Sequence, residues 1–199
     1  MRDRGRQGYR LQEFMNLPQA KQSSLKQAEL AALRFYTSHS YNALNIAMRD
    51  QSRVSPHPLP GIMMNIQKGL KKLRTLESGD ASSTETVVLW RGMNGLKLPD
   101  TFTRDGGTEL APMSTSTEVG VAIGYAIKTD TRSALLFRIV TRNNLQRGAD
   151  VQWLSMFPGE AETLFPPLTF LQTVVGTEPQ EVEHNGVKIT VVVLSASQS

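Results

Sequence analysis

Apolar residues in the first third of the chain recur every three or four positions, which is the spacing of one face of an α-helix. Residues 1–10 lack this pattern, and we expect them to be flexible. After a short helical piece near residues 11–17, the pattern predicts a helix that starts at Ser24-Leu25-Lys26-Gln27, a sequence typical of a capping box. It predicts a second helix from Ser40 and a third after a proline-rich loop over residues 52–61. The apolar positions of these three helices are Leu25, Ala28, Ala32, Leu33 and Tyr36, then Leu44, Ala47 and Met48, and then Ile62, Ile66, Leu70 and Leu73.

The pattern changes after a polar break over residues 78–83, because apolar residues then occur in short runs that are typical of strands. One helix is expected among them, where Val119, Ala122, Ile123 and Ala126 keep helical spacing. Strands are predicted over residues 86–91, 110–116, 134–140, 163–165, 168–175 and 187–194. Helices followed by strands, without regular alternation, predict a single α+β domain over residues 1–199. Its helical layer would cover residues 11–80 and its β-rich core residues 86–195.

Composition narrows the class of protein. The chain has 39% hydrophobic and 20% charged residues, which is typical of a globular domain. We find no apolar stretch of the length that a membrane span or a signal peptide needs, so we expect no membrane association, and the location in the cell stays open. Cysteine is absent and the three histidines are scattered, so neither a disulfide nor a metal site is predicted.

Charge is distributed unevenly along the chain. Residues 1–90 contain 13 Lys and Arg against 7 Asp and Glu, a balance of +6, whereas residues 91–199 contain 9 against 11, a balance of −2. This asymmetry favours an anionic ligand bound between the two halves. Basic and aromatic residues are not interleaved, so a nucleic-acid partner is not predicted. We expect the protein to be a monomer.

Two glutamates stand out in the last third of the chain. Ser155 to Gly159 has the residues of a tight loop, and Thr163-Leu164-Phe165 has those of a strand. Glu160 and Glu162 lie between them, and residues two apart on a strand point to the same face. Two carboxylates on one face repel each other, so stability alone gives little reason for the pair. The pair is therefore either part of a functional site or an exposed acidic turn.

Polar residues also end two of the earlier predicted strands. Arg91 closes the first strand and is followed by Gly92, and the next strand closes with Ser114-Thr115-Ser116. A guanidinium can hold a phosphate in a planar fork, and a glycine lets a ligand approach the backbone. The alternatives are a surface arginine in a strand–turn pair and the ordinary use of Ser and Thr in turns.

In this order, Arg91, Ser114-Thr115-Ser116 and Glu160-Ala161-Glu162 resemble the three motifs of the Arg–Ser–Glu class of mono-ADP-ribosyltransferases. That class includes the clostridial binary toxins and the vertebrate ecto-transferases. The segment from Tyr41 to Arg49 is similar to the Tyr/Asn/Arg helix of the family, and the resemblance covers roughly residues 11–195. It implies a helical layer packed on two small β-sheets, with a cleft for NAD+ between them.

The resemblance implies a role for each matching position. Glu162 would stabilise the positive charge that develops on the ribose as nicotinamide leaves, and Ser114 would bond to Glu162 and to the ribose. Glu160 would bind the acceptor arginine, because a glutamate at this place goes with arginine and a glutamine with asparagine. Tyr125 would pack against the nicotinamide, although a tyrosine on this helix could equally belong to the core. The residues implied for NAD+ binding are Arg49, Arg91, Gly92, Ser114, Thr115, Ser116, Tyr125, Lys128 and Glu162, and those for catalysis are Arg91, Ser114, Glu160 and Glu162.

These residues predict the transfer of one ADP-ribose from NAD+ to an arginine of a protein target, without a metal. The toxins often carry a second arginine after the first, whereas Gly92 follows Arg91 here as in the ecto-transferases, so the target stays open. Two alternatives remain. One is an NAD+ glycohydrolase, in which water replaces the acceptor arginine, and the other is a binding module on the same fold that has lost its chemistry.

Overall fold

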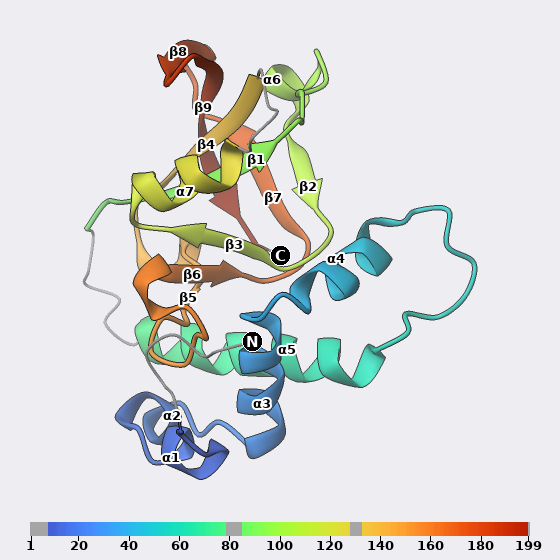
Figure 1. The fold of residues 1–199 in the computed structure, drawn as a ribbon, viewed down its shortest axis with the longest axis vertical. Coiled ribbons are helices and arrows are strands. Elements are labelled where there is room, and N and C mark those ends of the chain that lie inside the picture. The colour runs from blue at the N-terminus through green and yellow to red at the C-terminus, as the bar shows by residue number, and fades with distance from the viewer. Residues whose placement is uncertain (1–7, 79–84, 128–132, 199) are drawn as a thin grey trace.

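The computed structural model describes residues 8–78, 85–127 and 133–198. Helices form the N-terminal part and strands dominate the rest, so the predicted α+β class is confirmed (Figure 1). The helices are α1 (Leu11–Met15), α2 (Pro18–Gln22), α3 (Gln27–Tyr36), α4 (Tyr41–Arg49), α5 (Pro60–Ser78), α6 (Phe102–Asp105) and α7 (Val119–Ala126), with 3-10 turns η1 (Asn144–Gln146) and η2 (Pro158–Glu160). The strands are β1 (Val87–Asn94), β2 (Gly107–Glu109), β3 (Met113–Ser116), β4 (Ser133–Thr141), β5 (Ala149–Asp150), β6 (Glu162–Phe165), β7 (Thr169–Thr173), β8 (Gln180–His184) and β9 (Val187–Ser197).

Helix α3 begins later than the predicted capping box would place it, because its N-cap is Lys26 rather than Ser24. The backbone N–H of Lys26 donates to the Glu29 carboxylate at 2.8 Å, so the Glu29 side chain caps the N-terminus of the helix. Ser24, the predicted cap, has a backbone φ of 53° and lies in the turn before the helix. Glu29 is also paired with Lys72 of α5 at 2.7 Å, which links the two helices.

The helical layer packs on the β5–β6 end of the sheet, as Figure 1 shows. Leu33 of α3 and Leu70 of α5 are buried where the two helices meet, as their helical spacing predicts, and they share a core with Leu164 of β6. At Gly69 a Cβ atom would lie 2.8 Å from the side chain of Leu33, so the glycine allows α3 and α5 to approach closely. The layer is thereby fixed to the strand that carries Glu162.

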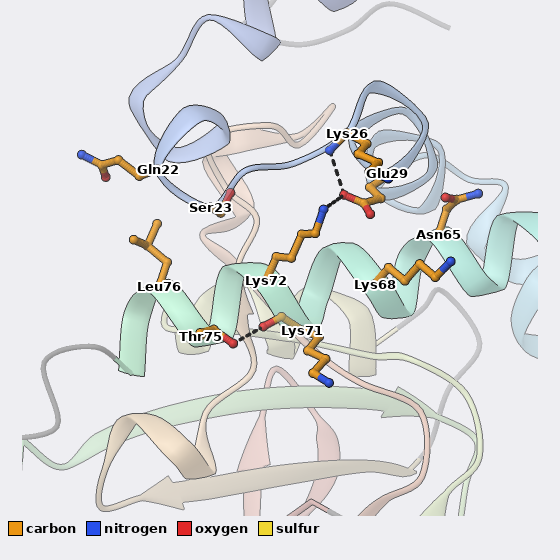
Figure 2. Close-up of a pocket in the computed structure, with 10 residues that line it drawn as sticks. All are labelled: Gln22, Ser23, Lys26, Glu29, Asn65, Lys68, Lys71, Lys72, Thr75 and Leu76. Carbon is orange, nitrogen blue, oxygen red and sulfur yellow. Dashed lines mark hydrogen bonds and ion pairs between the residues drawn. The ribbon is translucent and has the colours of Figure 1, made fainter.

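A cavity of about 720 Å³ lies between α5 and the segment that joins α2 to α3 (Figure 2). Lysines line much of it, and Lys72 reaches across to the carboxylate of Glu29 and to the carbonyl of Ser24. None of the residues predicted for the functional site lines this cavity.

The strands form one mixed sheet in the order β2-β7-β9-β4-β1-β3-β6-β5, and β8 pairs with β9 outside this path. The structure therefore differs from the expected pair of small sheets, because hydrogen bonding continues from one half to the other. The junction is narrow: in the described part, β1 and β3 meet in a single register pair, Trp90 with Ser116. By contrast, β1 pairs with β4 from Val87 to Asn94. The predicted site residues lie around this narrow junction.

Helix α7 packs directly on β1, and Gly92 makes this contact possible. A Cβ atom at position 92 would lie 1.8 Å from the backbone carbonyl oxygen of Ala122, far inside van der Waals contact. Gly92 was predicted to let a ligand approach the backbone, and the close packing of α7 is a second reason for a glycine at this position.

We expect Gly92→Ala to lower the free energy of unfolding by about 2 kcal/mol or more, because the methyl group meets backbone that cannot move aside cheaply. Gly124→Ala, on the helix α7 that packs against Gly92, is the control, because a Cβ atom there meets nothing within 4 Å. That exposed helical change should gain about 0.5–1 kcal/mol. Denaturant unfolding measures both, and equal midpoints for Gly92→Ala and the unmodified chain would contradict the packing argument.

Candidate active site

A cleft of about 480 Å³ lies where the helical layer meets the β1–β3 junction. Its walls come from the end of α3, from α4, from β1 and β3, from α7 and from the turn that carries Glu160. Of the predicted site residues, the following line it: Arg49, Arg91, Gly92, Ser114, Thr115, Ser116, Tyr125, Glu160 and Glu162. Lys128, the remaining one, lies outside the described residues.

Glu162 lies at the first position of β6, where it is only 8% exposed. Its carboxylate accepts a hydrogen bond of 2.6 Å from the hydroxyl of Ser114, so the predicted contact between the two is present. Burial raises the pKa of Glu162 to about 7, the Ser114 hydroxyl opposes this, and the nearby Glu160 carboxylate adds to it. Glu162 is therefore a carboxyl group that changes its charge near neutral pH.

The other two residues of the Ser-Thr-Ser motif bind the backbone next to the glutamates. The Thr115 hydroxyl donates to the carbonyl of Thr163 at 2.8 Å, and the Ser116 hydroxyl donates to the carbonyl of Glu160 at 2.7 Å. Ser116 also accepts the backbone N–H of Glu118 at the start of α7. Thr115 and Ser116 were predicted to bind NAD+, and in this structure their hydroxyls fix the strand and turn that present the two carboxylates.

Glu160 lies in a turn and not in a strand, as the predicted alternation requires. It is the last residue of the turn η2, and Ala161 after it has a left-handed backbone with φ 45° and ψ 51°. The prediction that Glu160 and Glu162 share a face by strand alternation is therefore wrong, because only Glu162 belongs to the strand. The left-handed residue brings both side chains to the same cleft.

The hydroxyl of Tyr125 donates to both oxygens of the Glu160 carboxylate, at 2.9 and 3.0 Å. Burial and this carboxylate raise the pKa of Tyr125. Tyr125 is 44% exposed, so the alternative of a core tyrosine does not hold. Its position beside Glu160 places the ring at the end of the cleft where the acceptor is expected.

The loop before Glu160 is anchored to the helical layer. The backbone N–H of Met156 donates to the Thr37 hydroxyl at 3.1 Å, and Arg34 donates to the carbonyl of Leu154 at 2.7 Å. The side-chain amide of Gln152 donates to the carbonyl of Pro158 at 2.8 Å, which holds the η2 turn from within the loop. These contacts connect the Glu160 side of the cleft to α3.

The two predicted arginines, Arg49 and Arg91, both lie next to a glutamate that was not predicted, Glu109. Arg91 is partly buried, and its Nη1 donates to the carbonyl of Ser114 at 2.8 Å. Arg49, at the end of α4, forms a bidentate pair with Glu109 of β2, with distances of 2.9 Å from Nε and 2.8 Å from Nη2. Burial lowers the pKa of Arg49, but the Glu109 carboxylate outweighs burial and raises it above the ordinary value. No motif in the sequence indicated Glu109.

Two more residues of the cleft wall were not predicted individually. The Tyr36 hydroxyl donates to the carbonyl of Pro112 at 2.7 Å and accepts from the Asn45 side chain at 3.0 Å. Burial raises the pKa of Tyr36 to about 12. The side-chain oxygen of Asn45 is buried and has no hydrogen-bond partner among the described residues. In the sequence, Asn45 was marked only as part of the segment from Tyr41 to Arg49 that resembles the Tyr/Asn/Arg helix of the family.

Neither a metal-binding cluster nor a helix that could span a membrane occurs in the described part of the chain. Within residues 8–78, 85–127 and 133–198, no cluster of three or more metal-binding side chains occurs. In the same ranges, no helix has the length and apolar composition needed to cross a membrane. The cleft is thus lined by two guanidiniums, of Arg49 and Arg91, and by two carboxylates, of Glu160 and Glu162.

Solved structures of ADP-ribosyltransferases confirm the predicted fold. Plx2a, an ADP-ribosyltransferase toxin from Paenibacillus larvae, matches with a TM-score of 0.64 at 17% identity, over 94% of this chain and 95% of that one. The Vis toxin of Vibrio splendidus, solved in complex with agmatine, matches with a TM-score of 0.61 at 18% identity, over 95% and 83% of the two chains. At these identities the likeness shows the fold.

Sequence relatives add the family. The protein Mav of Mycobacterium avium (strain 104), which carries the name of an NAD(+)–arginine ADP-ribosyltransferase, is 33% identical over 147 residues. The match covers 69% of this chain but only 15% of Mav. The model of the NAD:arginine ADP-ribosyltransferase family matches residues 6–191, which include every motif of the cleft. The predicted family is confirmed, and the chain belongs to the NAD:arginine ADP-ribosyltransferase family.

Proposed function

We propose that this chain transfers a single ADP-ribose from NAD+ to an arginine side chain of a protein target, and that the residues of the cleft divide the work. The observation that carries the proposal is the pair of carboxylates at one end of the cleft. One of them, Glu162, is buried and bonded to Ser114, and the other, Glu160, is held by Tyr125. A buried acid and a more accessible acid suit two different tasks.

The guanidinium end of the cleft suits the diphosphate of NAD+. Arg91 and Arg49 supply planar donors that match phosphate oxygens, and each lines the cleft. A cavity of about 480 Å³ lies within the ordinary range for ligand pockets.

Glu162 is proposed to act on the donor. Cleavage of the bond between nicotinamide and ribose develops positive charge on the ribose, and a fixed carboxylate nearby stabilises that charge. Ser114 holds one Glu162 oxygen at 2.6 Å, and the pairing of β3 with β6 fixes the backbone of both residues. The charged form is the useful one, so the raised pKa makes the reaction sensitive to pH near neutrality.

Glu160 is proposed to act on the acceptor. An arginine side chain stays protonated in water, and its nitrogen becomes a nucleophile only as the proton leaves. A carboxylate can bind the guanidinium in a bidentate pair and accept that proton as the new bond forms. The Vis structure was solved with agmatine, a small guanidine, which makes agmatine a suitable test acceptor here. Hydrolysis of NAD+ by water is the side reaction of the same site.

We expect Glu162→Gln to lower both nicotinamide release and agmatine labelling by about 100-fold or more, because the swap keeps the size and removes the charge. In the unmodified enzyme, kcat/KM for nicotinamide release should rise through about pH 7 and fall about tenfold per unit below it, as Glu162 takes up a proton. A pH-independent kcat/KM between about 5 and 8 would assign the electrostatic stabilisation to another group.

The same variant should change how stability depends on pH. Between the ordinary value of 4.5 and about 7, the folded Glu162 keeps a proton that the unfolded chain has lost, so rising pH lowers the free energy of unfolding in this window. Glu162→Gln has no carboxyl group at this position, so this decrease should be absent. The free energy of unfolding of the variant, minus that of the unmodified chain, should therefore increase by on the order of 3 kcal/mol between about pH 4.5 and 8. Urea unfolding of both proteins across this range measures the difference, and a difference that does not change with pH would contradict the raised pKa.

Glu160→Gln should separate the two activities. Agmatine labelling should fall by about 100-fold, because a neutral amide cannot take the guanidinium proton. Nicotinamide release from NAD+ alone should stay within about threefold of the unmodified enzyme, since water needs no carboxylate clamp. Both readouts are taken on the same protein sample.

The control for that experiment is Glu183→Gln on the exposed strand β8, which removes the same charge outside the cleft and should match the unmodified enzyme in both assays. A parallel loss of both activities in Glu160→Gln would place Glu160 in the donor site. Full retention of both would make Glu160 an acidic turn residue without a role in acceptor choice.

A further inference from the structure

Glu109 is the charged group that holds the arginine end of the cleft together. Its carboxylate accepts both Nε and Nη2 of Arg49, at 2.9 and 2.8 Å, and lies 3.9 Å from Nη2 of Arg91. Its side chain is only 16% exposed, and Arg91 beside it is 17% exposed. One carboxylate thus lies between two guanidiniums that would otherwise repel each other.

The backbone fixes the position of Glu109 before any contact with the arginines. Glu109 ends β2, where it pairs with Thr169 of β7, and its own carbonyl accepts the N–H of Leu168 at 2.8 Å. The side chain is fixed as well, because Oε1 accepts the backbone N–H of Ala111 at 3.0 Å. The carboxylate is therefore an anchored acceptor, and Arg49 is the side chain that adapts to it.

The fixed carboxylate of Glu109 restricts the conformation of the Arg49 side chain. It is the last residue of α4, its side chain is 41% exposed, and a long arginine loses substantial rotamer entropy when it is fixed. The pair with Glu109 uses Nε and one hydrogen of Nη2. The remaining nitrogen, Nη1, has no protein partner among the described residues, so it is available to a ligand in the cleft.

We propose that Glu109 is a positioning residue for NAD+ binding, which holds Arg49 with its free edge toward the diphosphate and balances the charge between Arg49 and Arg91. This inference rests on the proposed function, because it takes Arg49 and Arg91 as the diphosphate contacts. Glu109 does not touch the reacting bond and acts through Arg49. Loss of Glu109 should therefore weaken binding of the donor and leave the chemical step intact.

A carboxylate near a phosphate also repels it, so removal of Glu109 has two opposing effects. Repulsion is reduced because the bidentate pair with Arg49 compensates the carboxylate charge. The loss of order in Arg49 is not compensated, since its side chain has no other acceptor in the described part of the chain. We therefore expect the positioning effect to be the larger one.

The experiment measures ADP-ribose binding by calorimetry and NAD+ cleavage by nicotinamide release. Glu109→Gln should raise the Kd for ADP-ribose and the KM for NAD+ by about tenfold, with kcat within about twofold, because only uniform binding is lost. In an Arg49→Ala background, which already binds weakly, the second change to Glu109→Gln should have no further effect on Kd. Nicotinamide release by the unmodified enzyme is measured first, so a failure of the proposed function is recognised independently of Glu109.

An unchanged or lower Kd in Glu109→Gln would overturn the proposal, because repulsion would then equal or exceed positioning. If Glu109→Gln raised the Kd for ADP-ribose equally in the unmodified and the Arg49→Ala proteins, the proposal would also be overturned, because the effect would not depend on Arg49. Glu183→Gln on β8 serves as the control for removal of a negative charge. Thermal unfolding of each variant checks that it is folded.

Arg49→Lys tests the same pair from the other side if Glu109→Gln does not fold. Lysine keeps the positive charge but cannot form the two-point contact of a guanidinium with a carboxylate. Its Kd for ADP-ribose should lie close to that of Arg49→Ala. A Kd equal to that of the unmodified chain would show that the paired geometry has no role in binding.

Discussion

A buried carboxylate beside a hydroxyl is the interaction on which the rest of the cleft depends. Burial of Glu162 opposes its charge, and the Ser114 hydroxyl at 2.6 Å opposes that effect. The contact needs β3 and β6 in register, and the hydroxyls of Thr115 and Ser116 support that register by binding backbone carbonyls of the adjoining segment. The hydroxyls of the Ser-Thr-Ser motif thus fix the position of the Glu162 carboxylate and of the backbone beside it.

Residues of the helical layer bind the loop before Glu160 and also line the cleft. Through Thr37 and Arg34 the layer holds the loop that leads to Glu160, and through Arg49 it supplies one of the two guanidiniums. The glutamate side and the arginine side of the cleft are therefore both attached to residues of the helical layer. The charge asymmetry between residues 1–90 and 91–199 does not explain this arrangement, because Arg91 belongs to the same half as Glu160 and Glu162.

Elements with a strong apolar period could be predicted from the sequence, and elements defined by polar contacts could not. Ile66, Leu70 and Leu73 are buried, as the helical pattern of α5 requires. The strand β8 was missed because all its residues are exposed, so it has no alternation to detect. The start of α3 was misplaced because the Glu29 carboxylate, rather than Ser24, closes the helix.

The site could be predicted as far as its residues act through their own chemistry. Glu109 was missed because its role depends on Arg49, 60 positions away in the chain, and no local pattern marks such a pair. Glu160 was found by an argument that the structure corrects, since strand alternation does not apply across a left-handed Ala161. That correction has a physical consequence. Glu160 is positioned by Tyr125 at its carboxylate and by Ser116 at its carbonyl, whereas Glu162 is positioned by its strand and by Ser114, so the two carboxylates are held by separate contacts.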